Sequence, residues 1–396
     1  MDFTIPDELT ALRKSFGTFL DREVRPVEES MHEDLTGLDP DREALHTAVA
    51  GIRKRSADEG FYACYLPEAA GGWGVSTLGT ALLVEDAARS GLRLAPLALG
   101  LPSPSGPTPL LLQLPEHLHA TYLAPLVRGE QTMCFALTEP EAGSDAQAIR
   151  TSARRDGDEW VLDGMKHYIT NGDRADFAVV FAVTDKEKRA DGGITAFVVP
   201  RDRYRVGKVQ ATIADSHPAE LWFEESRVPA DHVIGEVGRG FHAAMGFLNG
   251  GRAGFAAQSL GFAEYCLEEA VKHARTRTAF GRPLAANQGV SFPLAECKAD
   301  IEAMRWITYH LAWLSDQAVD TGSTAGGNPM LDSSIAKYYC TEKAYAVADR
   351  CLQVFGGMGL LREGPVERIL RHLRVLRVVE GATEVQKLVI ARSMGL

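Results

Sequence analysis

The spacing of apolar residues changes twice along this 396-residue chain. Over the first 130 residues it follows a helical period, as at Ile5, Leu9 and Leu12, with charged residues in between. From about 131 to 238 short runs rich in β-branched and aromatic residues replace it, and after Gly240 the helical period returns almost to the end. Because strands and crossover helices do not alternate, we do not expect a parallel doubly wound sheet.

The middle segment is expected to form a β domain. Its short runs read MCFAL, TSARR, EWVLDG, FAVVFAV, ITAFVV and LWFEE, and RRDGDEWVLDG is typical of a hairpin. Before it, helices are expected at about 41–59 and 76–90. After it, long helices rich in Ala and Leu are expected at 240–277, 285–321, 331–355 and 381–394, with a loop at 321–329.

The predicted fold class is therefore α+β. We expect an N-terminal helical domain at 1–130, a middle antiparallel β-barrel or sandwich domain at 131–238, and a C-terminal four-helix-bundle domain at 239–396.

Composition excludes several classes of function. The formal net charge is -11 and no basic run is visible, so nucleic acid is not expected as the main ligand. No apolar run approaches the roughly 18–20 residues of a membrane span. Residues 1–30 mix both charges and carry several carboxylates, unlike a signal or transit peptide, which favours a cytoplasmic protein.

The six cysteines stand at positions 64, 134, 266, 297, 340 and 351. None are at CxxC spacing, and no Cys/His cluster resembles a metal-binding motif. We therefore expect buried, reduced thiols and no metal site.

Two polar segments follow predicted strands. The stretch from Thr138 to Asp145 (TEPEAGSD) is either a plain turn or a loop whose N–H groups and hydroxyls face a polar ligand, since Gly143 allows close approach. The segment His167–Gly172 (HYITNG) ends with the strong turn signal Asn-Gly. It is explained equally well by a half-buried strand end or by a ring and a hydroxyl offered to a planar cofactor.

Two further segments are weak signals when taken alone. Arg275, Arg277 and Arg282 surround TAFG and are typical of helix capping, although an arginine here could also meet a phosphate. The stretch QVFGGMG at 353–359 indicates a helix end with tight backbone approach. It lacks the order of a Rossmann fingerprint, and the chain contains no P-loop.

Glu380 allows two interpretations. It lies three residues after Arg377, which is the spacing of a surface ion pair on a helix. It also follows Val378 and Val379 and precedes Gly381, as expected for a carboxylate that leaves an apolar stretch at a bend. Partial desolvation raises the pKa of such a carboxylate and makes it a competent general base.

The order and spacing of these segments carry more information than each alone. The series LTEPEAGSD, KHYITNG, RTRTAFGRPLAANQ, QVFGGMG and VVEGATEVQ resembles the acyl-CoA dehydrogenase family from end to end. The resemblance implies a homotetramer built as a dimer of dimers, one FAD per subunit, an acyl thioester substrate and an electron-transfer flavoprotein as electron acceptor.

The resemblance also assigns roles to single residues, with Glu380 as the catalytic base. The residues that it assigns to the flavin end of the FAD are Phe135, Leu137, Thr138, Gly143, Ser144, Tyr168 and Thr170, and it places Ala382 and Glu384 by the FAD phosphates. Those that it assigns to the FAD of the neighbouring subunit, or to the pyrophosphate and adenosine, are Arg277, Phe280, Gln288, Gln353, Gly356 and Gly357. Those that it places near the thioester are Ser144, Asn249, Arg252 and Gly381.

The chain departs from the family pattern at several positions. Some members carry the base just before the arginine that corresponds to Arg252, and Gly251 stands there in this chain. The aspartate common three residues before that arginine is replaced by Asn249. The usual aromatic residue before the base is Val379, and the usual threonine two residues after it is Ala382, which leaves Glu384 as the next polar side chain.

The implied chemistry is α,β-dehydrogenation of a saturated thioester to a trans-2-enoyl thioester. The base removes the α-proton, and the β-hydrogen leaves as hydride to the flavin. In the family, the backbone N–H of the base residue and a ribityl hydroxyl donate to the thioester carbonyl. The alternatives are a flavin oxidase or monooxygenase of the same fold and a non-catalytic binding subunit. The sequence does not distinguish CoA from acyl carrier protein, nor does it give the acyl chain.

Overall fold

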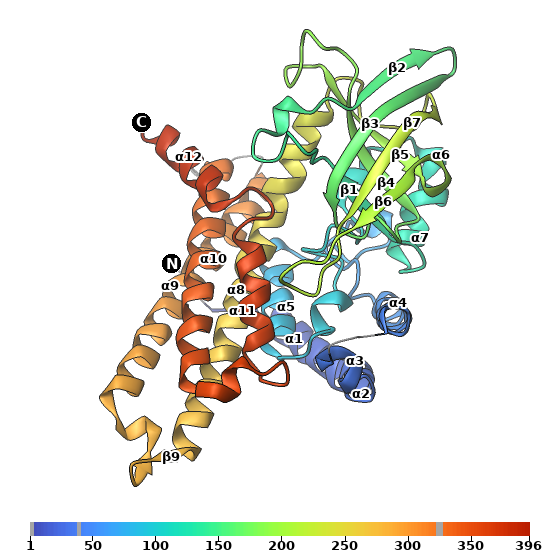
Figure 1. Ribbon diagram of the computed structural model, residues 1–396. Helices are drawn as coiled ribbons and strands as arrows, with labels where there is room; N and C mark the ends of the chain where they lie inside the picture. Colours follow the sequence, from blue (N-terminus) through green and yellow to red (C-terminus); the bar gives the residue numbers. More distant parts are fainter. Residues whose placement is uncertain (1–3, 38–40, 322–327) are drawn as a thin grey trace. The chain divides into compact units, whose positions relative to one another are not determined.

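The structure is a computed structural model that describes residues 4–37, 41–321 and 328–396. Over these ranges the chain forms two compact units, each discontinuous in sequence (Figure 1). The helical unit comprises Met1–Arg55, Val75–Ala98 and Asn249–Leu396, and the sheet unit comprises Ser56–Gly74 and Leu99–Leu248. This is a different division from the three consecutive segments expected from the sequence, whose limits stay a prediction.

Helices occupy the N- and C-terminal parts of the chain, as the periodicity predicts. The N-terminal ones are α1 Asp7–Phe19, α2 Arg25–Ser30, α3 His32–Thr36, α4 Arg42–Asp58, α5 Thr77–Arg89, α6 Glu116–Leu118 and α7 Ala124–Val127. The C-terminal ones are α8 Gly240–Thr276, α9 Gln288–Thr321, α10 Pro329–Val354, α11 Glu367–Leu376 and α12 Thr383–Ser393. The sequence did not predict α11, a short helix that follows Gly364 and Pro365. Most of the expected loop at 321–329 lies outside the described residues.

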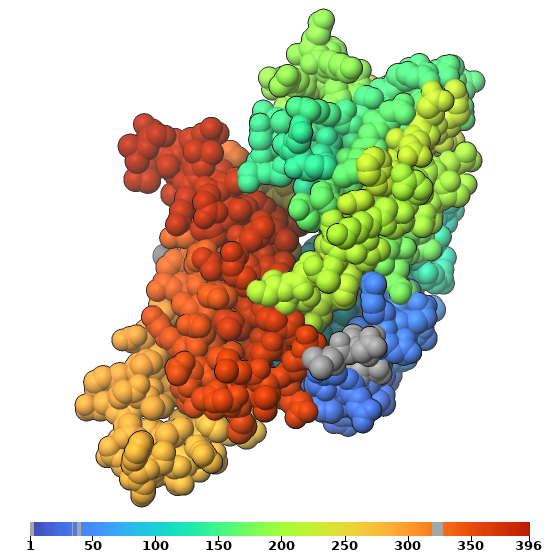
Figure 2. Space-filling view, in the orientation of Figure 1, coloured from blue at the N-terminus to red at the C-terminus, as the bar shows by residue number. Residues whose placement is uncertain are grey.

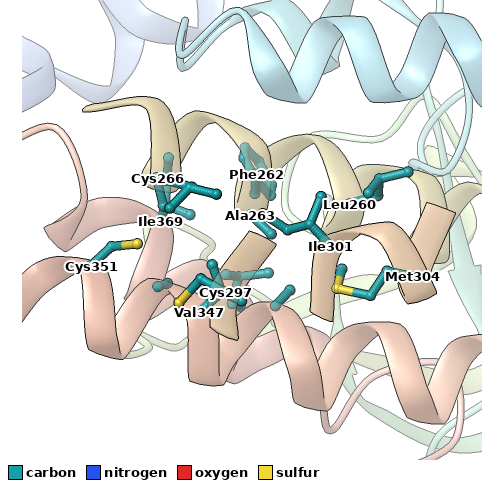
Figure 3. Packing of buried hydrophobic residues seen from close by; sticks show 14 of the residues in the cluster. Leu260, Phe262, Ala263, Cys266, Cys297, Ile301, Met304, Val347, Cys351 and Ile369 are labelled. Carbon is teal, nitrogen blue, oxygen red and sulfur yellow. The ribbon is translucent and has the colours of Figure 1, made fainter. Parts of the chain in front are cut away.

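The core of the helical unit lies among α8, α9, α10 and α11 (Figure 3). Many of its side chains are small, among them Ala256, Ala263 and Ala270 on α8 and Ala344 and Ala348 on α10. Small residues let helix axes approach closely, so the larger side chains can interdigitate between them. Cys266, Cys297 and Cys351 come from three different helices and pack in this core (Figure 3).

A buried ionic network joins α5 to α8 and α9 within the same unit. Nη1 of Arg305 lies 3.1 Å from Oε1 of Glu85, and its Nη2 lies 2.5 Å from Oε1 of Glu264. The Tyr309 hydroxyl donates to the other Glu85 oxygen at 2.8 Å. Burial raises the pKa of Glu85 to about 7, with the neighbouring Glu264 carboxylate contributing. The network therefore links α5 to the bundle helices, and the other Glu264 oxygen, Oε2, is buried without a partner in the described part of the chain.

The sheet unit is built on an eight-stranded sheet within the described residues. Its strands are β1 Met133–Ala136, β2 Ser152–Asp156, β3 Glu159–Ile169, β4 Phe177–Val183, β5 Ile194–Pro200, β6 Arg205–Val209, β7 Ala219–Pro229 and β8 Val233–Ile234. The order is β6-β7-β3-β2-β4-β5-β8, with β1 beside β4. Most pairs are antiparallel, as predicted, whereas β4 runs parallel to both β1 and β2.

Strand β4 is buried on both faces of the sheet. Phe177, Val179 and Phe181 enter one hydrophobic cluster, and Ala178 and Val180 enter the other. This explains why FAVVFAV is a continuous apolar run, because side chains alternate between faces along a strand. The expected hairpin is also present: β2 pairs with β3 from Ser152 to Asp156, and Gly157 in its turn has φ +60°.

All six cysteines are free thiols and buried, as predicted. Among the helices that the structure describes, none is long and apolar enough to cross a membrane.

Candidate active site

Glu380 lies in a short turn between α11 and α12. Its φ is +57°, and that of Gly381 is +87°, so two consecutive residues adopt the left-handed conformation. Glycine tolerates this region, whereas a glutamate is strained there. Backbone strain of this kind costs of the order of 1–3 kcal/mol and is held in place by surrounding contacts, typically at functional sites.

Those contacts come from α12 and α10. The Gln386 side chain donates to the Glu380 carbonyl at 3.3 Å and to the Gly381 carbonyl at 2.9 Å. The Lys337 ammonium on α10 donates to the same Gly381 carbonyl at 2.8 Å. Gln386 and Lys337 are both completely buried, so water does not compete for these bonds.

Glu342, also on α10, holds the two ends of the turn. It accepts hydrogen bonds from Nε of Arg377 at 2.8 Å and from the Thr383 hydroxyl at 2.6 Å. Thr383 N–H further donates to the Arg377 carbonyl at 3.0 Å. The ion pair formed by Arg377 is therefore with Glu342, and the surface pair between Arg377 and Glu380 that the sequence left open is not formed.

The Glu380 carboxyl group lies in a poorly solvated position. Its Oε2 atom is buried and has no hydrogen-bond partner among the described residues. Desolvation raises the pKa of Glu380 to about 7, although the nearby charges of Arg252 and Lys337 favour the carboxylate. A pKa close to neutrality suits a group that must accept a proton at physiological pH.

Arg252 on α8 belongs to the same cluster of residues. It is buried, and its Nη1 donates to Asn249 Oδ1 at 2.7 Å and to the hydroxyls of Ser333 and Ser334 at 3.3 and 3.4 Å. Its Nε atom is buried without a partner in the described part of the chain. The structure thus brings together four of the predicted site residues, Asn249, Arg252, Glu380 and Gly381.

Gly251, beside Arg252 on α8, has open space around it. A Cβ atom at this position would meet no heavy atom within 4 Å. A longer side chain would therefore fit at Gly251, the position at which the resemblance places the base of some family members.

In the sheet unit, the loop after β1 is fixed by a buried ion pair. Nζ of Lys166 on β3 lies 2.7 Å from Oε1 of Glu139 and donates to the Leu137 carbonyl at 3.0 Å. Glu139 also accepts from the N–H groups of Arg150 and Thr151. Desolvation lowers the pKa of Lys166 to about 8. Burial opposes ionisation of Glu139 as well, but the Lys166 charge and the hydrogen bonds from Lys166, Thr151 and Arg150 together lower its pKa.

This ion pair joins the first two sequence motifs. His167 N–H donates to the Thr138 carbonyl at 2.9 Å, so the end of β3 lies against the loop. Behind the loop, Phe135 stacks on Phe247, with ring centroids 4.6 Å apart, and Leu137 is buried. Gly143 and Ser144 are exposed further along the loop.

Tyr168 is turned outward by an irregularity in β3. The register with β7 shifts between Lys166 and Ile169, and Tyr168 has φ +59°. Its side chain is 61% exposed, and its ring stacks on His167 at 3.9 Å. Bulges with left-handed residues often re-aim a side chain next to an active site. Thr170, two residues on, is exposed as well.

The other predicted cofactor residues lie elsewhere in the helical unit. Arg277 and Phe280 lie on the segment that joins α8 to α9, which contains the small hairpin β9 Thr278–Ala279 and β10 Arg282–Pro283, and Gln288 is the first residue of α9. This segment protrudes from the end of the bundle (Figure 2), and Phe280 at its tip is 100% exposed. Gln353, Gly356 and Gly357 are exposed at the end of α10.

Ala382 and Glu384 flank the start of α12. Ala382 is its N-cap residue, and no side chain caps the helix there. Glu384 lies in the first turn and is exposed.

Sequence reasoning missed the residues that hold the site in place. These are Lys166 and Glu139 in the sheet unit and Lys337, Glu342 and Gln386 in the helical unit. One usable signal was present: Lys337 follows Ser333 and Ser334 by one helical turn and precedes Thr341 by another, all on a face of small or polar residues. A lysine on such a face is a candidate for burial.

The helical unit thus carries a desolvated carboxyl group near two cations, and the sheet unit carries an exposed aromatic ring and an exposed hydroxyl. Three family models match the chain: Acyl-CoA dehydrogenase, N-terminal domain at 6–130, middle domain at 134–224 and C-terminal domain at 238–395. The chain belongs to the acyl-CoA dehydrogenase family. This confirms the family and the fold class that the sequence motifs predict.

Individual relatives match over the whole chain. An acyl-CoA dehydrogenase of Bacillus subtilis is 34% identical, with 98% of each chain covered. The structure of butyryl-CoA dehydrogenase from Megasphaera elsdenii is 34% identical with a TM-score of 0.85 and 100% of both chains covered. A structure described as the electron transferring flavoprotein of Acidaminococcus fermentans is 32% identical, with a TM-score of 0.86 and coverage of 100% of this chain and 99% of the other.

Proposed function

We propose that this chain catalyses the α,β-dehydrogenation of a saturated acyl-CoA to the trans-2-enoyl-CoA, with Glu380 as the base. The observation that carries the proposal is the state of the Glu380 carboxyl group. One of its oxygens is buried without a partner in the described residues, and desolvation raises its pKa to about 7. Membership of the acyl-CoA dehydrogenase family supplies the reaction class.

FAD is the cofactor of this family, and the residues present fit it. Tyr168 offers an exposed ring, and Ser144 and Thr170 offer exposed hydroxyls. A Cβ atom at Gly143, Gly356 or Gly357 would meet nothing within 4 Å, so the backbone there is open to a large ligand.

The proposed contacts with FAD divide between its two ends. The residues that would lie along the flavin are Phe135, Leu137, Thr138, Gly143, Ser144, Tyr168 and Thr170. The FAD of the neighbouring subunit would be held by Arg277, Phe280 and Gln288. The pyrophosphate and adenosine would be held by Gln353, Gly356 and Gly357, and the start of α12 at Ala382 and Glu384 would face the FAD phosphates. When bound, FAD accepts the β-hydrogen as hydride and so supplies the redox step.

The chain's own residues supply the proton chemistry. Glu380 accepts the α-proton of the thioester, which requires its ionised form. Arg252 and Lys337 favour that form by their charge, while desolvation keeps the carboxylate basic. The backbone N–H of Glu380 would donate to the thioester carbonyl as negative charge develops there. The thioester would be positioned by Ser144, Asn249, Arg252 and Gly381.

The proposal includes the partners of the reaction. We propose an electron-transfer flavoprotein as electron acceptor, in line with the similarity to a chain in a structure of that description. We also propose a homotetramer, as the resemblance to the family implies, in which the completely exposed Phe280 would lie at an interface. The cytoplasmic location stays a prediction, and the six free, buried thiols are typical of a reducing compartment.

Anaerobic titration with acyl thioesters tests this function. The purified holoprotein is mixed with saturated acyl-CoAs of increasing chain length, starting with butyryl-CoA, and with the matching acyl carrier protein thioesters. Bleaching of the flavin absorbance and formation of the enoyl-CoA are expected with at least one acyl-CoA. Bleaching by the carrier-protein thioesters alone would contradict CoA as the carrier.

Two further outcomes would replace the proposal by its alternatives. If the protein retains FAD but no thioester bleaches it, the non-catalytic binding subunit is the better description. If oxygen reoxidises the reduced flavin within each turnover and electron-transfer flavoprotein does not, the chain is an oxidase.

A further inference from the structure

We propose that Lys337 is a positioning residue of the dehydrogenation reaction, which holds the left-handed turn that presents Glu380 and places a fixed positive charge beside it. This inference rests on the proposed role of Glu380 as the base. Lys337 lies on α10, 43 residues before Glu380 in the sequence, and no sequence motif pointed to it.

The Lys337 side chain is completely buried and makes a specific contact. Its ammonium lies 2.8 Å from the carbonyl oxygen of Gly381, the residue that follows Glu380. Among the described residues, the Gly381 carbonyl is the hydrogen-bond partner that the structure gives to the Lys337 ammonium. A buried amine without an ion pair is costly, and desolvation lowers the pKa of Lys337 to about 8. Packing alone would be served better by an apolar side chain.

The Gly381 carbonyl receives a second donor from another helix. Gln386 on α12 donates to it at 2.9 Å, so α10 and α12 both bind the same oxygen. With both φ angles positive at Glu380 and Gly381, the turn has little intrinsic stability of its own. Removing the Lys337 ammonium would leave Gln386 as the side chain that binds the carbonyl groups of Glu380 and Gly381. The Glu380 carboxyl group would then be free to move.

Lys337 also acts on the charge state of the base. The charged groups that influence it are Arg252 on α8, Glu380 in the turn, Glu342 on its own helix and Glu384 on α12. Its charge and that of Arg252 both favour ionised Glu380. Loss of one cation from a poorly solvated cluster therefore raises the pKa of the base.

Lys337→Met separates this role from ordinary packing, because methionine fills similar space without a donor or a charge. The matched control is Thr341→Val, one turn along α10. Thr341 is also completely buried, but its hydroxyl donates to the Lys337 carbonyl within the helix at 2.8 Å and does not contact the turn. Both holoproteins are checked for FAD content and oligomeric state before kinetics.

We expect Lys337→Met to keep its FAD and to be reduced by butyryl-CoA about 10- to 100-fold more slowly at neutral pH, as for a misplaced catalytic group. The midpoint of the rate against pH should move upward by about one pH unit, since a neighbouring cation has been removed. Thr341→Val should keep both the rate and the midpoint of the wild-type protein.

Failure of this inference differs from failure of the proposed function. If the wild-type protein is reduced by the thioester but Lys337→Met keeps the wild-type rate and pH midpoint, Lys337 has no positioning role. A slower rate with an unchanged midpoint, matched by Thr341→Val, would also overturn it, because the effect would then be one of packing. If no thioester reduces the wild-type protein, the proposed function itself is at fault.

Discussion

Arg377 forms its ion pair with Glu342 on α10, at 2.8 Å, and leaves Glu380 without that partner. The spacing of three residues would have allowed an Arg377–Glu380 pair on a helix, but α11 ends at Leu376, just before Arg377. The chain then turns through Glu380 and Gly381 in left-handed conformations. Because Glu380 forms no ion pair with Arg377, its carboxyl group is available for proton transfer.

Glu380→Gln tests that availability directly. Glutamine keeps the size of the side chain and removes the proton acceptor. We expect FAD to stay bound and flavin reduction to slow by roughly 10²–10⁴-fold, as is typical for loss of a general base. Stopped-flow absorbance with butyryl-CoA measures the rate, and Glu363→Gln, an exposed site in the same unit, controls for the change in net charge. Near-normal reduction of the Glu380 variant would place the base elsewhere.

The pKa of Glu380 predicts how stability and rate depend on pH. Its value in the folded protein is about 7, compared with 4.5 ordinarily, so the folded state binds more protons than the unfolded state between these values. The contribution of Glu380 to stability is therefore complete below pH 4.5 and is lost as pH rises through 7. We expect the melting temperature of Glu380→Gln, relative to wild type, to increase from pH 5 to pH 8.

The rate should show the opposite dependence in the wild-type protein, because the base acts in its ionised form. Flavin reduction should accelerate as pH rises through about 7. A rate that stays flat between pH 5.5 and 8.5 would argue against a base with this pKa.

Gly251→Glu in the Glu380→Gln background is expected to restore part of the activity. The resemblance to the acyl-CoA dehydrogenase family places an alternative base at this position, and a Cβ atom at Gly251 would meet nothing within 4 Å. Replacing an interior helical glycine also stabilises α8 by about 0.5–1 kcal/mol. We expect reduction at least tenfold faster than in Glu380→Gln alone. Gly251→Gln in the same background is the control, and equal rates for the two double variants would show that no carboxylate acts from this position.

The Lys166–Glu139 pair is expected to be essential for the loop after β1. Lys166→Met leaves the Glu139 carboxylate buried without its cation, which typically costs about 3–5 kcal/mol. Removing both charges, in Lys166→Met with Glu139→Gln, should recover part of the loss. Urea unfolding of the FAD-free proteins measures both effects. Additive losses would mean that the two residues do not act as a pair.

Phe280→Asp is expected to weaken oligomerisation and FAD retention together. Phe280 is completely exposed at the tip of the β9–β10 hairpin, so the substitution removes no contact within the subunit. The thermal stability of the isolated subunit should therefore hardly change. Light scattering and the ratio of flavin to protein absorbance provide the measurement. A tetramer with a full complement of FAD would show that Phe280 does not lie at an interface.

The sequence was sufficient for the broad architecture. Helical spacing predicts α4, α5, α8, α9, α10 and α12 within a few residues, and the alternation of short apolar runs predicts the principal strands. The strands β8, β9 and β10 have two residues each, which is too few for a period to be visible, and β6 is interrupted by Gly207. Helix α11 was missed although its period is visible, because Ile369, Leu373 and Leu376 stand at helical spacing and are buried.

The sequence by itself determined the order of helices and strands, the order of the motifs and the identity of Glu380 as a candidate base. All of these follow from the spacing of residues that are neighbours in the chain. Tertiary structure alone decided that Arg377 forms its ion pair with Glu342, that Lys337 and Gln386 bind the turn that holds Glu380, and that Tyr168 faces outward. These outcomes depend on which distant side chains become neighbours. Desolvation and pKa follow from that packing and not from the residues next to a group in the chain.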